Sequence, residues 1–187
     1  MISLTALWLP IVLSSVAVFF VSFIIHMVLK YHNNDYGQVP SEDGVMDALR
    51  PFDIPPGDYV LPRAADMKAM GSDEFKAKQD KGPVAIMTVL PNGQWSMAKS
   101  LVQWFVYCLV TGVLVAYITR MTIAPGADYL LVHRVAGATA FCCYSMAHLS
   151  NSIWYMKKWS GTLKNMFDGL VYGLVTGGVF GWLWPGV

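Results

Sequence analysis

Charged residues are scarce in this sequence. Asp, Glu, Lys and Arg make up only 13% of its 187 residues, whereas about 25% is usual in soluble domains. The formal net charge is +1, so the chain lacks the basic surplus with which nucleic-acid-binding proteins neutralise phosphates. The composition therefore argues against an ordinary soluble domain and against a nucleic-acid partner.

Cysteine is also scarce, and the common catalytic signatures are absent. The three cysteines, Cys108, Cys142 and Cys143, lie within apolar runs, which does not indicate a disulfide framework. The sequence contains no CxxC pair, no Cys/His pair at zinc spacing, no phosphate-binding glycine loop and no GxSxG motif. We therefore expect no metal site and no catalytic activity.

What the chain does have is long apolar runs. A helix rises about 1.5 Å per residue, so roughly 20 apolar residues cross a hydrocarbon layer about 30 Å thick. Four runs of about this length predict membrane-spanning helices, at residues 8–29, 100–119, 129–149 and 163–184. The first run has no positive charge before it and is longer than a signal-peptide core, so we expect it to remain as a helix.

Residues 31–97 have a different composition, with ten acidic residues against six Lys and Arg. Helix signals follow Pro40 and Ser72, and β-favouring runs occupy 59–61 and 84–90, next to Pro/Gly turns. These signals predict a small mixed α/β module. The alternative is a partly ordered loop.

Basic residues close to the spans predict the orientation, because they are enriched on the cytoplasmic side. Five lie on one side and two on the other: Lys30, Lys99, Lys157, Lys158 and Lys164 against Arg120 and Arg134. We therefore expect both termini outside and the module inside. The predicted fold is an all-α membrane protein of four transmembrane helices: helix one (1–30), a cytoplasmic α/β module (31–97) and a three-helix unit (98–187).

Glycines line one face of the last predicted span. They recur every fourth residue, at Gly169, Gly173, Gly177 and Gly181, and are called the glycine seam below. In lipid, glycine lets a neighbouring backbone approach closely. Gly112 and Gly137 thin the second and third helices in the same way. We expect the seam to pack these helices together, or against a partner helix or a second copy.

Two histidines raise the hypothesis of a haem. His26 and His148 lie near the cytoplasmic ends of helices one and three, so their imidazoles are expected at similar depth. Two histidines from different helices at one depth are what a six-coordinate haem b requires. His133 lies at the opposite end and His32 in the loop, so no second pair forms. The alternative is that both are ordinary interfacial histidines.

Asp168 is the only carboxylate well inside an apolar run, and intramembrane carboxylates are costly and often functional. Lys164 lies four residues before it and is expected to pair with it across one turn. His148 is expected nearby, on the antiparallel neighbouring helix. The three residues predict a polar group that either locks the helices or relays a proton in a small transporter. Arg134 is expected to reach the interface or a lipid headgroup.

Four stretches, residues 2–31, 124–137, 152–154 and 167–185, together resemble a family of bacterial inner-membrane proteins of four predicted spans. The family carries no established activity or catalytic residue. The resemblance therefore implies a bacterial inner-membrane location, with both termini in the periplasm, and implies nothing about mechanism.

The leading functional hypothesis is a non-enzymatic accessory, assembly or scaffold protein that packs against partner helices or itself. It depends on the glycine seam and on the shortage of buried polar groups. The alternatives are a haem b electron carrier using His26 and His148, and a small transporter using Asp168 and His148. The bilayer itself is the one partner that the composition predicts directly.

Overall fold

The computed structural model describes residues 2–94 and 96–186. The chain forms two compact units. Residues 1–37 and 96–187 form the helical unit, and residues 38–95 form the polar unit. The boundary differs from the predicted one, because the segment 31–37 belongs with the helices and not with the polar unit. Its side chains are bonded to the last helix, as described below.

The structure is mostly helical, and three of its helices are long and apolar enough to cross a membrane: Leu4–Val28, Met97–Thr122 and Tyr129–Tyr155. The first comprises η1 (Leu4–Leu7), α1 (Trp8–Phe23) and the π-helical η2 (Ile24–Val28). The second is α5 (Met97–Thr122). The third comprises α6 (Tyr129–Phe141), the π-helical η4 (Cys142–Met146) and α7 (His148–Tyr155). A multi-pass membrane protein is therefore supported.

The fourth predicted span forms helix α8 (Trp159–Trp182), which is 24 residues long. Length and composition together do not place α8 among the helices able to cross a membrane. Lys164, Asp168 and the glycines lower the hydropathy of α8. The structure thus contains a fourth long helix beside the three apolar spans.

The polar unit contains a two-stranded antiparallel sheet, in which β1 (Gly57–Leu61) pairs with β2 (Ala85–Val89). Around it lie α2 (Glu42–Leu49), η3 (Arg50–Phe52), α3 (Met67–Met70) and α4 (Asp73–Lys81). The Ser72 hydroxyl accepts a hydrogen bond from the Phe75 amide at 3.2 Å and caps α4. The predicted alternation of helices and strands is confirmed for these residues.

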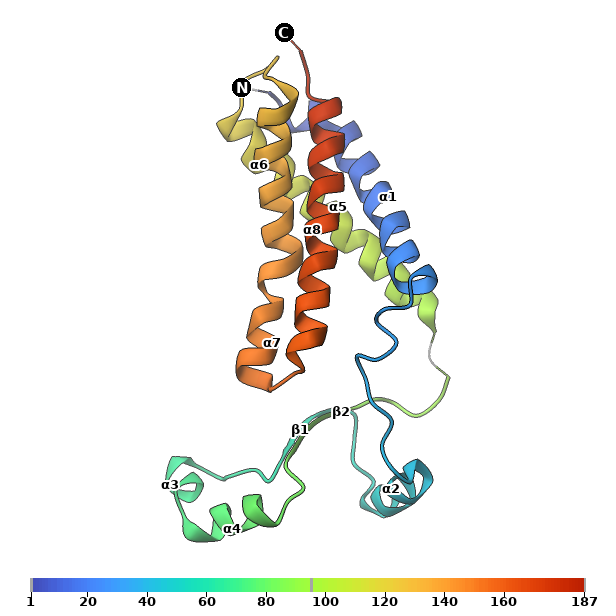
Figure 1. Ribbon diagram of the computed structural model, residues 1–187, viewed down its shortest axis with the longest axis vertical. Coiled ribbons are helices and arrows are strands. Elements are labelled where there is room, and N and C mark those ends of the chain that lie inside the picture. The colour runs from blue at the N-terminus through green and yellow to red at the C-terminus, as the bar shows by residue number, and fades with distance from the viewer. Residues whose placement is uncertain (1, 95, 187) are drawn as a thin grey trace. The chain divides into compact units, whose positions relative to one another are not determined.

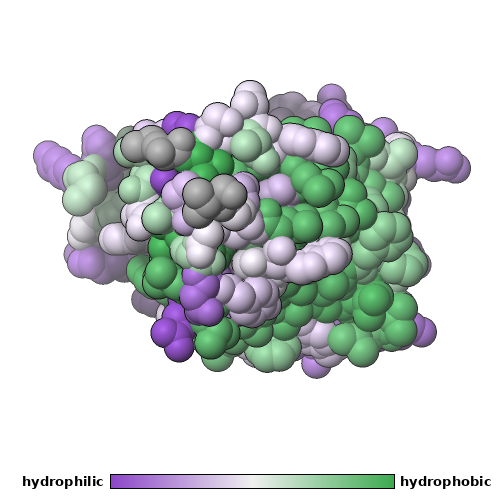
Figure 2. All heavy atoms as spheres, turned by 90° about the horizontal axis from the view of Figure 1, so that it is seen from above, coloured by the Kyte–Doolittle hydropathy of each residue, from purple (hydrophilic) through white to green (hydrophobic). Residues whose placement is uncertain are grey.

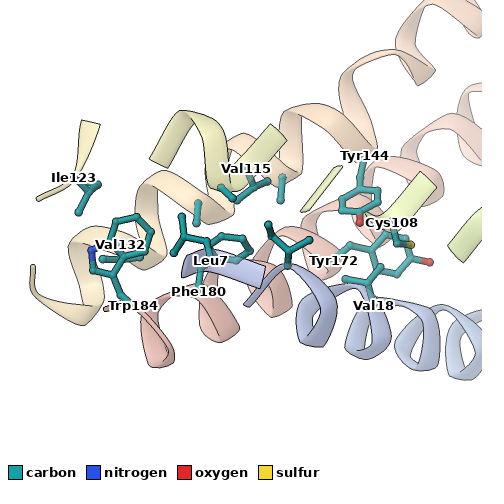
Figure 3. Packing of buried hydrophobic residues seen from close by; sticks show 14 of the residues in the cluster. Leu7, Val18, Cys108, Val115, Ile123, Val132, Tyr144, Tyr172, Phe180 and Trp184 are labelled. Carbon is teal, nitrogen blue, oxygen red and sulfur yellow. The ribbon is translucent and has the colours of Figure 1, made fainter. Parts of the chain in front are cut away.

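In the helical unit, α6 and α8 run side by side, and both chain ends lie at the same end of the unit (Figure 1). Buried apolar side chains from all the long helices meet between them, among them Leu7, Val115 and Phe180 (Figure 3). The Trp184 indole donates a hydrogen bond to the Ala124 carbonyl at 2.9 Å. The end of α8 is thus tied to the turn between α5 and α6.

The outer faces of the spans are apolar. Only 33%, 28% and 28% of an 18-residue apolar stretch in each of the three spans, in chain order, is buried, and residues such as Phe20, Val102 and Leu130 are more than half exposed. Hydrophobic residues cover a wide area of the surface in Figure 2. Apolar patches of this extent indicate contact with lipid or with other apolar helices.

Candidate functional site

The glycine seam is filled by helix α6 of the same chain. A Cβ atom added to Gly177 would lie 2.6 Å from the His133 carbonyl oxygen. One added to Gly173 would lie 2.9 Å from the Gly137 carbonyl oxygen. Both obstacles are backbone atoms, so the two helices touch at a distance that only glycine permits. The seam is thus used within the chain, as helix packing, and is not left open for a partner.

A group of ionisable side chains lies together at the end of the helical unit opposite the termini. They come from the end of the first span, the segment after it and the first turns of α8. Six of them form the His–Asp cluster: His26, Tyr31, His32, Asp35, Lys164 and Asp168. Residues more than 130 positions apart in the sequence are therefore brought together.

Asp168 lies at the centre of the cluster and is only 3% exposed. Its Oδ2 atom is 2.8 Å from His32 Nε2 and 3.9 Å from His26 Nε2. Its other oxygen, Oδ1, accepts a hydrogen bond from the Tyr31 hydroxyl. This buried carboxylate is thereby partnered on both oxygens, as burial of a charge requires.

Local backbone geometry brings the two histidines together. His26 lies in the π-helical η2, a kind of segment frequent at functional sites. Lys30 then adopts a positive φ of 56°, which ends the helix and reverses the chain. The reversal is held by the Asn33 amide, which donates to the Lys30 carbonyl at 3.1 Å. As a result the imidazole rings of His26 and His32 lie 4.6 Å apart between centroids.

A second layer of contacts orients His32. The Asp35 carboxylate lies 2.6 Å from His32 Nδ1 and accepts a hydrogen bond from Lys164 Nζ at 2.7 Å. Lys164 also donates to the Tyr31 carbonyl and the Asn34 side chain, each at 2.6 Å. Burial acts to raise the pKa of Asp35, but the hydrogen bonds from Lys164 and His32 outweigh it and hold the pKa below its ordinary value. Asp35 therefore remains a carboxylate facing His32.

The remaining predicted site residues are placed differently from the expectation. Lys164 bonds to Asp35, and no ion pair joins it to Asp168 in the described part of the chain. His148 begins α7, half-buried, and makes no side-chain hydrogen bond or ion pair with the residues described. No hydrogen bond or ion pair joins His148 to Asp168 among the described residues. Arg134 is exposed on α6.

The haem hypothesis paired His148 with His26, and the transporter hypothesis paired it with Asp168. The structure gives the partner of His26 as His32, by ring contact, and that of Asp168 as His32, by hydrogen bond. A haem held by His26 and His148 would require His26 to leave this arrangement. His32 and Asp35 were missed because both were assigned to the polar module. The sequence feature that could have indicated them is a histidine and a carboxylate placed directly after a predicted span.

The cluster has two chemical capacities. Imidazole and carboxylate groups can share protons and form an ionic lock between α8 and the segment 31–37. The same nitrogen and oxygen donors are ligands for divalent first-row metals. No family model, curated protein or solved structure matches this chain. The resemblance to a four-span family therefore stays a prediction.

Proposed function

We propose that the chain is a non-catalytic accessory or scaffold protein of the bacterial inner membrane. The observation that carries this proposal is the closed glycine seam. Gly173 and Gly177 meet the backbone of α6 so closely that the paired helices form a fixed body. Such a body suits a static role, in which helices hold a polar unit at the membrane and contact other helices.

The proposal includes a fourth span formed by α8. Its 24 residues extend over about 36 Å, enough to cross the hydrocarbon layer. It also lies along α6, which belongs to an apolar span. With the termini in the periplasm, the His–Asp cluster and the polar unit are cytoplasmic. This orientation agrees with the excess of Lys and Arg expected on that side.

A reporter fused to the C-terminus tests this topology, because three spans and four spans place it on opposite sides of the membrane. With the N-terminus outside, alkaline phosphatase fused after residue 186 is active only if α8 crosses. We expect high activity there and low activity for a fusion in the turn after Lys81. Low activity at the C-terminus together with a periplasmic N-terminus would contradict the fourth span.

Transport receives less support. Of the residues that the structure describes, Asp168 is the only charged one that is fully buried, whereas proton relays use chains of ionisable groups through the membrane. The cluster lies at one end of the unit, where its contacts to Asp35 and Lys164 fasten the segment 31–37 to α8. An ionic lock formed by the cluster therefore agrees better with a static role than a proton relay does.

Photo-crosslinking in native membranes tests the scaffold role. A photoreactive residue at Val102, which is 65% exposed, is expected to trap helices of another membrane protein or a second copy. The matched control is Val115, which is fully buried on the same helix and is expected to give only crosslinks within the chain. If both positions yield only the 20.7 kDa chain, the proposal fails.

A further inference from the structure

We propose that His26, His32 and Asp168 bind a divalent first-row transition-metal ion, with zinc or manganese as examples of the class. This inference goes beyond the scaffold role and beyond a purely ionic lock. It gives the helical unit a metal clasp that joins the first span, the segment 31–37 and α8. The scaffold proposal does not depend on it.

The spacing of the donor atoms carries the inference. One donor atom from each of the three residues lies within 4.8 Å of the other two. A tetrahedral ion with bonds of about 2.0–2.2 Å holds its ligands about 3.3–3.6 Å apart. The Asp168 oxygen lies 2.8 Å from His32 Nε2 and 3.9 Å from His26 Nε2, so the observed distances straddle that range. Small ring movements bring both nitrogens to bonding distance.

The contacts behind the donors match those of metal sites. A metal-bound histidine almost always donates a hydrogen bond from its other ring N–H to a carboxylate or a carbonyl, which fixes the tautomer. Here Asp35 lies 2.6 Å from His32 Nδ1, so Nε2 is left to face Asp168. Tyr31 holds the remaining oxygen of Asp168, and Lys164 holds Asp35. Two of the three donors are thus oriented before an ion arrives.

His26 distinguishes a metal site from a simple lock. The lock needs only His32, because its two nitrogens already contact the two carboxylates. The imidazole of His26 is nevertheless held against the ring of His32 and faces the same oxygen of Asp168 at 3.9 Å. In the described residues it makes no hydrogen bond. An ion between the three groups explains its position.

The donor set also indicates which ions fit. Two imidazoles and one carboxylate suit zinc, iron, manganese, cobalt or nickel, whereas calcium and magnesium prefer six or more oxygens. The side chain of His26 is 47% exposed, which leaves one side of the site open. An ion can enter there, and a water can occupy the fourth coordination position. The carboxylates of Asp168 and Asp35 offset the charge of the ion.

Metal titration of the full-length protein, purified in mild detergent and stripped with a chelator, tests the proposal. Cobalt(II) serves as the spectroscopic probe, and zinc(II) binding is measured by competition and by metal analysis. We expect one ion per chain. His26→Ala is the informative variant, because it leaves the contacts of His32 with Asp35 and Asp168 in place. We expect it to weaken binding at least about 100-fold, and Asp35→Asn to weaken it about 10–100-fold.

His148→Ala is the matched control, because His148 lies outside the cluster, and its affinity should equal that of the unchanged protein. An unchanged protein that binds no stoichiometric ion would overturn the proposal and leave an ionic lock. So would a His26→Ala variant that binds as tightly as the parent, or a His148→Ala variant weakened as much as His26→Ala. Each of these results leaves the crosslinking test of the scaffold role unaffected.

Discussion

Replacing glycine by alanine at two neighbouring positions of α8 measures the steric cost of closing the glycine seam. At Gly177 the added Cβ would lie 2.6 Å from the His133 carbonyl oxygen and 3.0 Å from Gly137 Cα. At Gly178 the nearest atom would be the Tyr129 hydroxyl oxygen, at an ordinary 3.7 Å. The two substitutions are chemically identical and differ only in what the new methyl group meets.

The expected magnitudes follow from these contacts. Alanine is favoured over glycine in a helix by about 1 kcal/mol, and this gain applies to both variants. At Gly177 the methyl group pushes on backbone, so α6 and α8 must separate by roughly 1 Å. Overpacking of this kind costs about 1–3 kcal/mol. Because the propensity gain cancels in the comparison, this is the expected stability difference between the variants.

Thermal unfolding in one detergent, followed by tryptophan fluorescence, is the assay. For a chain of this length, 1 kcal/mol corresponds to a shift in Tm of about 2–4 °C. We therefore expect Gly177→Ala to unfold about 2–12 °C below Gly178→Ala. Gly178→Ala should match or slightly exceed the parent. Equal Tm values for the two variants would refute the close contact between α6 and α8.

Two further predictions concern polar contacts of the helical unit. Ser152→Ala removes a buried hydrogen bond of 2.6 Å to the Thr162 hydroxyl. It should lower the free energy of unfolding by about 1–3 kcal/mol, because the Thr162 hydroxyl is left unpaired. An equal loss for Ser150→Ala, at an exposed position, would contradict this. Lys164→Met removes three hydrogen bonds to the segment 31–37. The amides of Asn33 and Asp35 should then exchange with solvent at least about tenfold faster, and unchanged protection would show that the segment is held by other contacts.

Much of the fold was predictable because its signals are local. Ser72 caps α4 and Asp128 caps α6, the latter by accepting from the Leu130 amide at 3.0 Å, and both were readable from residue type and position. The apolar runs gave the three spans in the same way. The glycine spacing places these residues on one face, since four residues make about one turn, and Gly173 and Gly177 on that face meet α6.

The site was not predictable from such signals. His32 reaches Asp168 only because the chain turns at Lys30, which has a positive φ. Lysine rarely adopts this conformation, so the residue type does not predict the turn. The expected pairing of Lys164 with Asp168 rested on helical spacing alone. Lys164 instead makes a tertiary contact, because the carboxylate of Asp35 lies within reach at the more exposed end of the cluster.

The two π-helical segments are places where a span can lose a residue and keep the direction in which its side chains face. The η4 segment fits an extra residue into one turn, and the Cys143 carbonyl within it accepts a hydrogen bond from the Tyr107 hydroxyl at 2.7 Å. Deleting one residue there would convert the segment to regular α-helix, and Ser152 would still face Thr162. The same deletion in the middle of α5, a regular α-helix, would turn everything after it by about 100°. The effect of a lost residue on helix packing thus depends on where in a span it is lost, although the change in hydrophobicity is the same.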